Sequence, residues 1–243
     1  MKSIWTITKR ELAGYFNSPV AYVFLVIFLL MTGAFTFLIG QFMDRNQATL
    51  QAFFMWHPWI YLFLVPAVGM RLWSEERRLG TMELLLTMPI SLWHCIIGKF
   101  LASWLFLTLA LVMTFPIWIT VNYLGDPDNT VIVASYIGSF FLAGAYLSIT
   151  SMTSAFTRNQ VISFILSVVI CLFLVLCGWP PVTDVVEPLA PRAIVDFIAA
   201  SSVMTNVEQF NNGQIDSRAV IYFLSVIGFP LFATSVIIRG LRA

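Results

Sequence analysis

Charged side chains are scarce in this sequence of 243 residues. Asp, Glu, Lys and Arg together make up 10% of the chain, whereas soluble domains usually carry about 25%. Hydrophobic residues make up 59%. A water-soluble globule of this size needs a surface that is largely polar, and this composition cannot supply one. The shortage of charge therefore excludes an ordinary soluble domain and indicates an integral membrane protein.

The usual motifs of enzymes and nucleotide-binding proteins are also missing. The chain has no G-x-x-x-x-G-K-[S/T] phosphate loop, and no Ser/His/Asp order or carboxylate pair stands out as a catalytic set. We therefore predict no catalytic residues and no cofactor in this chain. Lys and Arg occur only in small groups, which argues against a nucleic-acid partner.

Cysteine and histidine are too few, and too scattered, for a metal site or a disulfide framework. Cys95, Cys171 and Cys177 lie within or beside apolar runs and form no CxxC pair, so we interpret them as small buried hydrophobic residues. His57 lies among aromatic residues and His94 begins a later apolar run. Neither has a second ligand at metal-binding spacing, so we predict no metal.

What the sequence has in abundance is long apolar runs. A helix needs about 20 apolar residues to cross a bilayer, and six runs come close to this length or exceed it. They predict an all-α integral membrane protein with six transmembrane helices. The first run is too long for a signal peptide and lacks a small-x-small cleavage site. The predicted spans are about 20–43, 53–73, 94–121, 131–156, 160–178 and 219–238.

Two shorter helices are expected outside these spans. Residues 1–19 are amphipathic and suit an interfacial connecting helix, which Asn17-Ser18-Pro19 would end. Residues 20–243 then form the transmembrane domain. The loop 179–217 has a moderately apolar centre, 193–204, which predicts a short re-entrant helix on the outer side.

The distribution of Lys and Arg gives the spans a direction. With both termini in the cytoplasm, the inner segments hold ten of these cations and the outer segments hold three, counted along the sequence. This bias agrees with the rule that cytoplasmic loops are rich in positive charge. It also supports an even number of spans.

The interiors of the predicted spans contain no Asp or Glu. Proton-coupled carriers usually need ionisable groups at mid-membrane, so their absence argues against a proton-driven carrier. Lys99 lies near the inner end of its span, where its side chain can reach the interface. Pro66, Pro116 and Pro230 lie inside spans, and they are either hinges for gating or tolerated kinks.

The predicted inner loop between the second and third spans carries the strongest functional signal. Glu75, Glu76, Arg77 and Arg78 form a compact charged group. Beyond it, Thr81 could cap a short helix whose early Glu83 complements the helix dipole. Such an amphipathic helix at the inner surface, held by a charged hinge, could dock on a cytoplasmic partner. The alternative is a solvated loop with incidental helix.

Four sequence segments together resemble a known family. They are EERRLGTMELLLTMPIS at 75–91, GKF at 98–100, KRELAGYFNSPVAYV at 9–23 and FNNGQID at 210–216. The inner-loop motif is similar to that of the ABC-2 type permeases, which are membrane subunits of ATP-binding-cassette transporters. The N-terminal and late segments resemble the gliding-motility and nitrous-oxide (GldF/NosY-like) branch. The resemblance extends over nearly the whole chain.

The resemblance implies partners and roles that composition alone does not. It implies a second permease copy or paralogue and a cytoplasmic P-loop ATPase subunit, which binds the ATP and Mg that this chain lacks. The inner loop would be the coupling helix, and the N-terminal helix would make a second contact through Lys9, Arg10 and Glu11. The loop 179–217 would close the exit. The residues expected to face or brace the ATPase are Glu75, Glu76, Arg77, Arg78, Gly80, Thr81 and Glu83.

We therefore expect an exporter permease in the lipid bilayer of a bacterial inner membrane, alternating access as the ATPases open and close. An auxiliary periplasmic-facing subunit is a further partner to consider. Two other functions stay open: an ion-coupled secondary carrier or channel, and a non-transport membrane scaffold of a surface or respiratory assembly.

Overall fold

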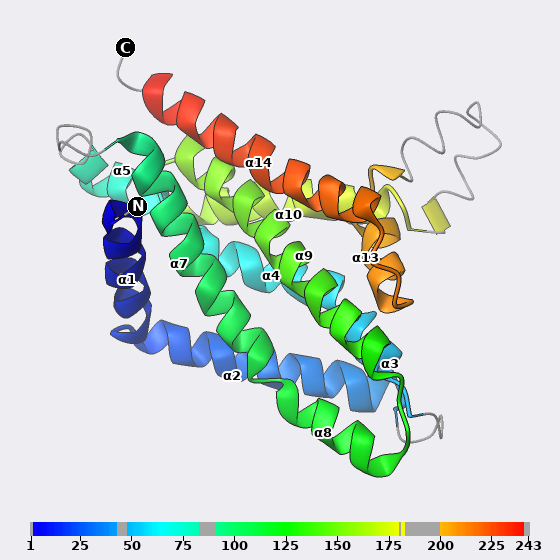
Figure 1. The fold of residues 1–243 in the computed structure, drawn as a ribbon. Coiled ribbons are helices and arrows are strands. Elements are labelled where there is room, and N and C mark those ends of the chain that lie inside the picture. The colour runs from blue at the N-terminus through cyan, green and yellow to red at the C-terminus, as the bar shows by residue number, and fades with distance from the viewer. Residues whose placement is uncertain (1, 43–47, 83–90, 180, 183–199, 241–243) are drawn as a thin grey trace, which may run out of the picture.

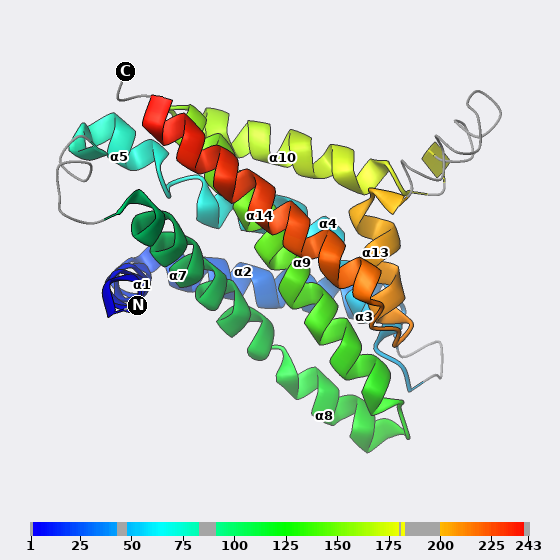
Figure 2. The same ribbon diagram turned by 45° about the horizontal axis from the view of Figure 1, so that its top comes forward.

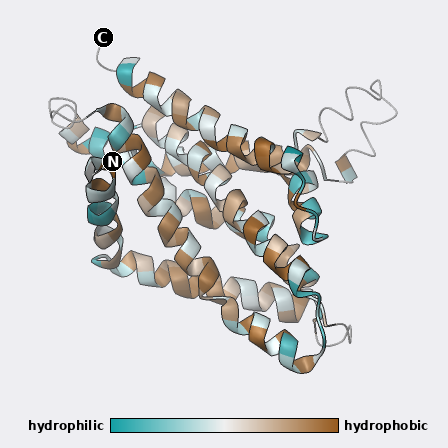
Figure 3. Ribbon diagram, in the orientation of Figure 1, coloured by the Kyte–Doolittle hydropathy of each residue, from teal (hydrophilic) through white to brown (hydrophobic). Residues whose placement is uncertain are grey.

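The computed structural model describes residues 2–42, 48–82, 91–179, 181–182 and 200–240. Helices dominate these ranges and no strand occurs within them, as Figure 1 shows. The long helices carry apolar residues along most of their length, while hydrophilic residues collect near their ends (Figure 3). The distribution suits a bundle whose middle lies in lipid.

The chain begins with α1 (Lys2–Phe16) and turns sharply into α2 (Pro19–Ala34) (Figure 1). The turn has a local cause: the Ser18 hydroxyl accepts a hydrogen bond from the Val20 amide at 3.3 Å, and Pro19 occupies the first helical turn. The end of α2 continues as a π-helical segment, Phe35–Ile39. The structure thus places a helix break at the predicted Asn17-Ser18-Pro19.

Two predicted spans are interrupted in the structure. The span expected over 53–73 is divided into α3 (Gln51–Phe54) and α4 (His57–Gly69), followed by a turn and then α5 (Ser74–Leu79). The span expected over 94–121 is divided into α7 (Leu92–Val112) and α8 (Phe115–Leu124). Proline causes both breaks, since Pro58 and Pro116 each start a new helix and cannot donate a backbone hydrogen bond to the preceding turn.

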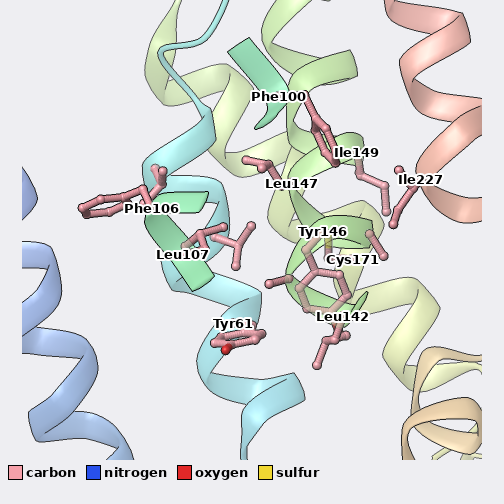
Figure 4. Packing of buried hydrophobic residues seen from close by; sticks show 14 of the residues in the cluster. Tyr61, Phe100, Phe106, Leu107, Leu142, Tyr146, Leu147, Ile149, Cys171 and Ile227 are labelled. Atoms are coloured by element: carbon pink, nitrogen blue, oxygen red, sulfur yellow. The ribbon is translucent and has the colours of Figure 1, made fainter. Parts of the chain in front are cut away.

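The second half of the chain contains α9 (Asn129–Phe156), α10 (Gln160–Leu176), α13 (Val203–Asn211) and α14 (Ser217–Gly240). Helix α9 is central and contacts α4, α7, α10, α13 and α14. Figure 4 shows the core that results, with Tyr146 of α9 near Cys171 of α10 and with Tyr61 of α4 in the same cluster. Small residues allow the close approach: a Cβ on Gly144 would lie 2.8 Å from the Trp104 ring.

Within the described ranges, four helices are long and apolar enough to cross a membrane: Pro19–Ile39, Leu92–Leu124, Asn129–Phe156 and Ser217–Gly240. Helix α10, an apolar helix of 17 residues, would extend about 25 Å at 1.5 Å per residue. The interrupted α3–α4 segment would be the sixth crossing, so the count of six stays a prediction. The predicted re-entrant helix lies mostly at 193–199, outside the described residues, and the described short helix of this loop, α13, comes later in the chain.

The bundle has two distinct ends. Helices α1 and α5 and the C-terminal end of α14 lie at one end, whereas α3, α13 and the connection from α8 to α9 lie at the other (Figures 1 and 2). These are the two groups of segments that the charge distribution assigned to opposite sides of the membrane. The arrangement brings the predicted coupling loop and the N-terminal helix to the same end.

Candidate functional site

The candidate site begins where α1 packs along α7. A Cβ on Gly98 would lie 2.7 Å from Cγ2 of Ile7, so glycine is needed for the two helices to come this close. The Thr8 hydroxyl donates to the Gly98 carbonyl at 3.2 Å. Further along, the Tyr15 and Ser103 hydroxyls lie 2.8 Å apart. Helix α1 is therefore attached to α7 by both packing and polar contacts.

Lys99, next to this contact, joins three helices. Its Nζ lies 2.9 Å from Oε1 of Glu76 in α5 and 3.3 Å from Oε2 of Glu11 in α1. The Lys99 residue is only 6% exposed, and its Nζ lies 5.6 Å from the centre of the Trp73 ring. We call Glu11, Lys99 and Glu76 the charged junction. It connects the N-terminal helix, α7 and the predicted coupling loop.

The start of α5 is also fixed to the end of α9. The backbone amides of Trp73 and Ser74 both donate to the Ser154 hydroxyl at 3.0 Å. The Trp73 indole donates to Ser151 at 3.0 Å, and Arg77 donates to the Ala155 carbonyl at 2.6 Å. The two bonds to Ser154 satisfy the first amides of α5, which a helix cannot pair internally. These hydrogen bonds would therefore transmit a displacement of α5 directly to α9.

Burial and neighbouring charges together shift the pKa of two groups at this end. Burial is the largest single influence on Glu11 and works to raise its pKa. The attraction of Lys99 and the hydrogen bonds from Arg10 and Lys99 outweigh it, so the pKa of Glu11 lies below its ordinary value. The pKa of Arg77 is lowered, first by burial and then by the nearby positive charge of Arg158. Glu11 is thus held as a carboxylate that can pair with Lys99.

The structure divides the predicted coupling residues into two groups. Glu75, Glu76 and Arg77 are half-buried, and the latter two contact other helices. Arg78, Gly80 and Thr81 are exposed. Gly80 ends α5 in the left-handed region with a φ of 71°, and the Thr81 hydroxyl donates to the Glu76 carbonyl at 3.4 Å. Glu83 lies outside the described residues.

The expected local structure of this loop was partly wrong. We predicted a charged hinge at Glu75–Arg78, but these residues lie within the helix α5. The reason is visible in the helix ends: Glu75 and Glu76 lie in the first turn and Arg77 and Arg78 in the last, which suits the helix dipole at both ends. The helix predicted beyond Thr81 falls mainly on 83–90, outside the described residues.

The predicted N-terminal contacts differ in their surroundings. Lys9 is exposed, and Arg10 has a side chain that is 67% exposed while donating to Glu11 at 2.9 Å. Glu11 alone turns toward the charged junction. Lys9 and Arg10 therefore remain accessible for a partner at the same end as Arg78.

Sequence reasoning did not select Lys99 as a site residue. We expected its side chain to reach the interface, whereas the structure buries it between two carboxylates. The available signal was its place in the GKF segment, directly after the glycine that contacts α1. A lysine inside an apolar run needs a partner, and the N-terminal helix and the inner loop offered Glu11, Glu75, Glu76 and Glu83.

The three predicted hinge prolines occupy different settings. Pro66 is buried inside α4, while Pro116 starts α8 at a real break. Pro230 lies inside α14 and leaves the Val226 carbonyl without its helical donor. The Ser148 hydroxyl of α9 lies 2.9 Å from that carbonyl. This contact favours a supported kink at Pro230; gating by any of the three stays a prediction.

No group of three His, Cys, Asp or Glu side chains that could hold a metal ion occurs among the described residues. His57 is buried with its Nδ1 2.7 Å from the Ser139 hydroxyl and its ring stacked on Tyr61. The prediction of no cofactor in this chain remains a prediction.

Long apolar helices, a buried core around α9 and a polar end define a multi-pass membrane protein. The family model described as ABC-2 family transporter protein matches residues 5–213, and the chain therefore belongs to this family of transporter proteins. It is a membrane component of an ABC transporter. No match was found among curated proteins.

Proposed function

We propose that this chain is the permease subunit of an ABC exporter of the GldF/NosY-like branch, in a bacterial inner membrane. It crosses six times with both termini in the cytoplasm, pairs with a second permease and binds a cytoplasmic ATPase. The family match supports the ABC-2 class. The observation that carries the coupling role is the charged junction, because it connects the two segments that the resemblance assigns to ATPase contact.

The proposed coupling path starts at the exposed end of α5. The ATPase contacts Arg78, Gly80 and Thr81, together with Lys9 and Arg10 on α1. Helix α5 transmits the movement to α9 through the bonds at Ser154 and Ala155. The charged junction transmits it to α1 and α7. Because both routes use contacts between helices, α5 and the core respond to ATPase closure together.

The test uses coexpression with the cognate ATPase, and the informative variant is Arg78→Glu. Reversing an exposed charge at a protein interface weakens association, here by about tenfold, and should lower ATP-dependent transport equally. The matched control is Arg218→Glu, which reverses an exposed charge near the start of α14, at the opposite end of the bundle. Equal assembly and coupling in both variants would contradict the coupling assignment.

Two results would contradict the proposal that this chain belongs to an ATP-driven exporter. Transport driven by an ion gradient in vesicles without ATP would support the secondary carrier. Full biological function with an ATPase-dead partner would support the non-transport scaffold. In the proposed exporter, both conditions abolish transport because this chain supplies no energy of its own.

A further inference from the structure

A cleft of about 480 Å³ opens beside the charged junction. Its walls come from α1, α2, the end of α4, α5 and α7. One part of the wall is apolar, including Ala21, Phe24, Val68 and Phe106. The other part is charged, and it contains three carboxylates and two cations: Glu11, Glu75, Glu76, Arg71 and Lys99. A site with this division suits an amphiphile rather than a small soluble ion.

The charges that remain available have opposite signs. Lys99 is already paired with Glu11 and Glu76. Arg71 is exposed and Glu75 half-buried, and within the described part of the chain neither has a hydrogen-bond or ion-pair partner. Oε2 of Glu76 is buried and likewise lacks a hydrogen-bond donor there. Counted over the described residues, the cleft therefore has one unpaired cation and two carboxylates with an unpaired oxygen, which matches a zwitterion.

The aromatic residues that line the cleft indicate which kind of ammonium group the ligand carries. A quaternary ammonium is recognised by a cage of open ring faces. The rings at this cleft pack on one another instead: Tyr15 stacks on Phe106 with centres 5.1 Å apart, and Phe24 lies 5.6 Å from Phe106. Carboxylate oxygens, by contrast, accept hydrogen bonds from a primary ammonium. The cleft thus favours ethanolamine over choline.

The apolar wall points to a lipid as the source of this headgroup. Val20 lines the cleft and is 53% exposed, at the start of a helix whose outer face is apolar throughout. An acyl chain can therefore leave the cleft along α2 while its headgroup stays beside α5. Arg71 would pair with the phosphate, since guanidinium groups bind phosphate oxygens well.

We propose that this cleft binds a phosphatidylethanolamine molecule, with its phosphate at Arg71 and its ammonium at Glu75 and Glu76. The lipid would occupy the space between α1 and α5. The proposal concerns the permease alone and requires neither the ATPase nor a known cargo. Its failure and the failure of the proposed transport function are therefore separate results.

The experiment measures lipid bound to the purified full-length chain by native mass spectrometry. Phosphatidylethanolamine, phosphatidylcholine and phosphatidylglycerol with identical acyl chains are each titrated into delipidated protein, and soluble O-phosphorylethanolamine is the fourth probe. We expect phosphatidylethanolamine to bind at least about fivefold more tightly than the others, the effect of one retained charge-assisted hydrogen bond. Glu75→Gln should remove most of this preference. Arg71→Gln should instead weaken the binding of all three phospholipids, since each of them carries the phosphate.

A steric variant tests the location. Gly14 lines the cleft and a Cβ added there meets nothing within 4 Å, so Gly14→Leu should fold while filling part of the space. The matched control is Gly228→Leu on α14, where a Cβ also meets nothing within 4 Å. We expect lipid binding to fall in the first variant only.

Three outcomes would overturn the proposal. Equal binding of phosphatidylcholine or stronger binding of phosphatidylglycerol would refute ethanolamine recognition. Binding of O-phosphorylethanolamine as tight as that of the lipid would show a soluble-ligand site. Unchanged phosphatidylethanolamine binding in Gly14→Leu would place the lipid elsewhere.

Discussion

Lys99 is the residue whose surroundings matter most in this chain. A buried ammonium loses its hydration, and that loss is tolerated only when carboxylates replace the lost water. Glu11 and Glu76 both lie within 3.3 Å of its Nζ. Because these two acids lie on α1 and α5, the two ion pairs of Lys99 hold α1, α5 and α7 together.

Removing the charge of Lys99 should weaken this end of the bundle. Lys99→Met leaves Glu11 and Glu76 facing each other without a cation, and we expect a loss of about 2 kcal/mol or more in the free energy of unfolding. Thermal unfolding in detergent gives the measurement. Arg10→Met removes an exposed cation from the same region as the control and should change little.

Neutralising the two carboxylates tests whether unpaired negative charge causes the instability of Lys99→Met. Adding Glu11→Gln and Glu76→Gln to Lys99→Met removes the stranded negative charges and should restore part of the stability. A triple variant less stable than Lys99→Met would show that the carboxylates stabilise this region by some route other than Lys99.

Glu11 gives the junction a dependence on pH. Its pKa in the folded chain lies below the ordinary value of 4.5, so its pairing contributes stability above that pH. The contribution is lost as the pH falls through the lowered pKa. We expect the amides of α1 to exchange hydrogen faster, relative to their intrinsic rates, at pH 4 than at pH 7.

The pH effect should vanish in Glu11→Gln, which cannot ionise. Hydrogen exchange of α1 in this variant should have the same protection at both pH values. Persistence of the acid-induced change would assign it to another group.

At the scale of elements, the contact between α1 and α7 depends on the absence of a side chain at Gly98. Gly98→Ala places a Cβ 2.7 Å from Ile7 Cγ2, and overpacking of this kind costs about 1–3 kcal/mol. Ile7→Ala in the same chain should recover part of the loss. Gly33→Ala, on α2 with nothing within 4 Å, is the matched control.

The test at Gly98 depends on whether the effects of Gly98→Ala and Ile7→Ala on the free energy of unfolding are additive. Unfolding free energies of the two single variants and the double variant form a cycle, and the coupling between positions 7 and 98 should be favourable. Simple additivity of the two substitutions would mean that α1 does not pack on α7 in the membrane.

Much of the helical architecture could be predicted from sequence because its causes are local. Long apolar runs require helices in lipid, and Ser18-Pro19 marks a helix start by its own chemistry. The breaks at Trp56 and Thr114 were harder, because a proline inside an apolar run either starts a new helix or only bends one. Packing against neighbouring helices decides between these outcomes.

The site was less predictable than the fold. The charged group at 75–78 was visible, but its division into inward and outward residues depends on where α5 meets α9. The pairing of Lys99 with Glu11 joins positions 88 residues apart in sequence. No local pattern specifies such a contact, because it exists only once α1 has packed on α7.

At the scale of the molecule, the separation of the two ends predicts an orientation. Arg78 lies at the end with α1 and α5, and Tyr123 at the opposite end, 90% exposed. In intact cells, Tyr123→Cys should react with a membrane-impermeant thiol reagent, whereas Arg78→Cys should react only after permeabilisation. Cys177, the native cysteine that is not buried, is replaced by serine in both variants.

The reverse labelling pattern would contradict the assignment of both termini to the cytoplasm. Reaction of both positions from the same side would contradict the single span, Leu92–Leu124, between them. Buried Cys95 and Cys171 remain in every variant and provide the background signal.

The charged junction has a consequence for conformational change. Lys99 has two partners on two different helices, so either α5 or α1 can move away while one carboxylate stays. The ammonium is never left bare during such a step, and the electrostatic barrier to moving one helix at a time is lower than for a single buried ion pair. The charged junction therefore allows α1 and α5 to move one after the other while Lys99 keeps a carboxylate partner throughout.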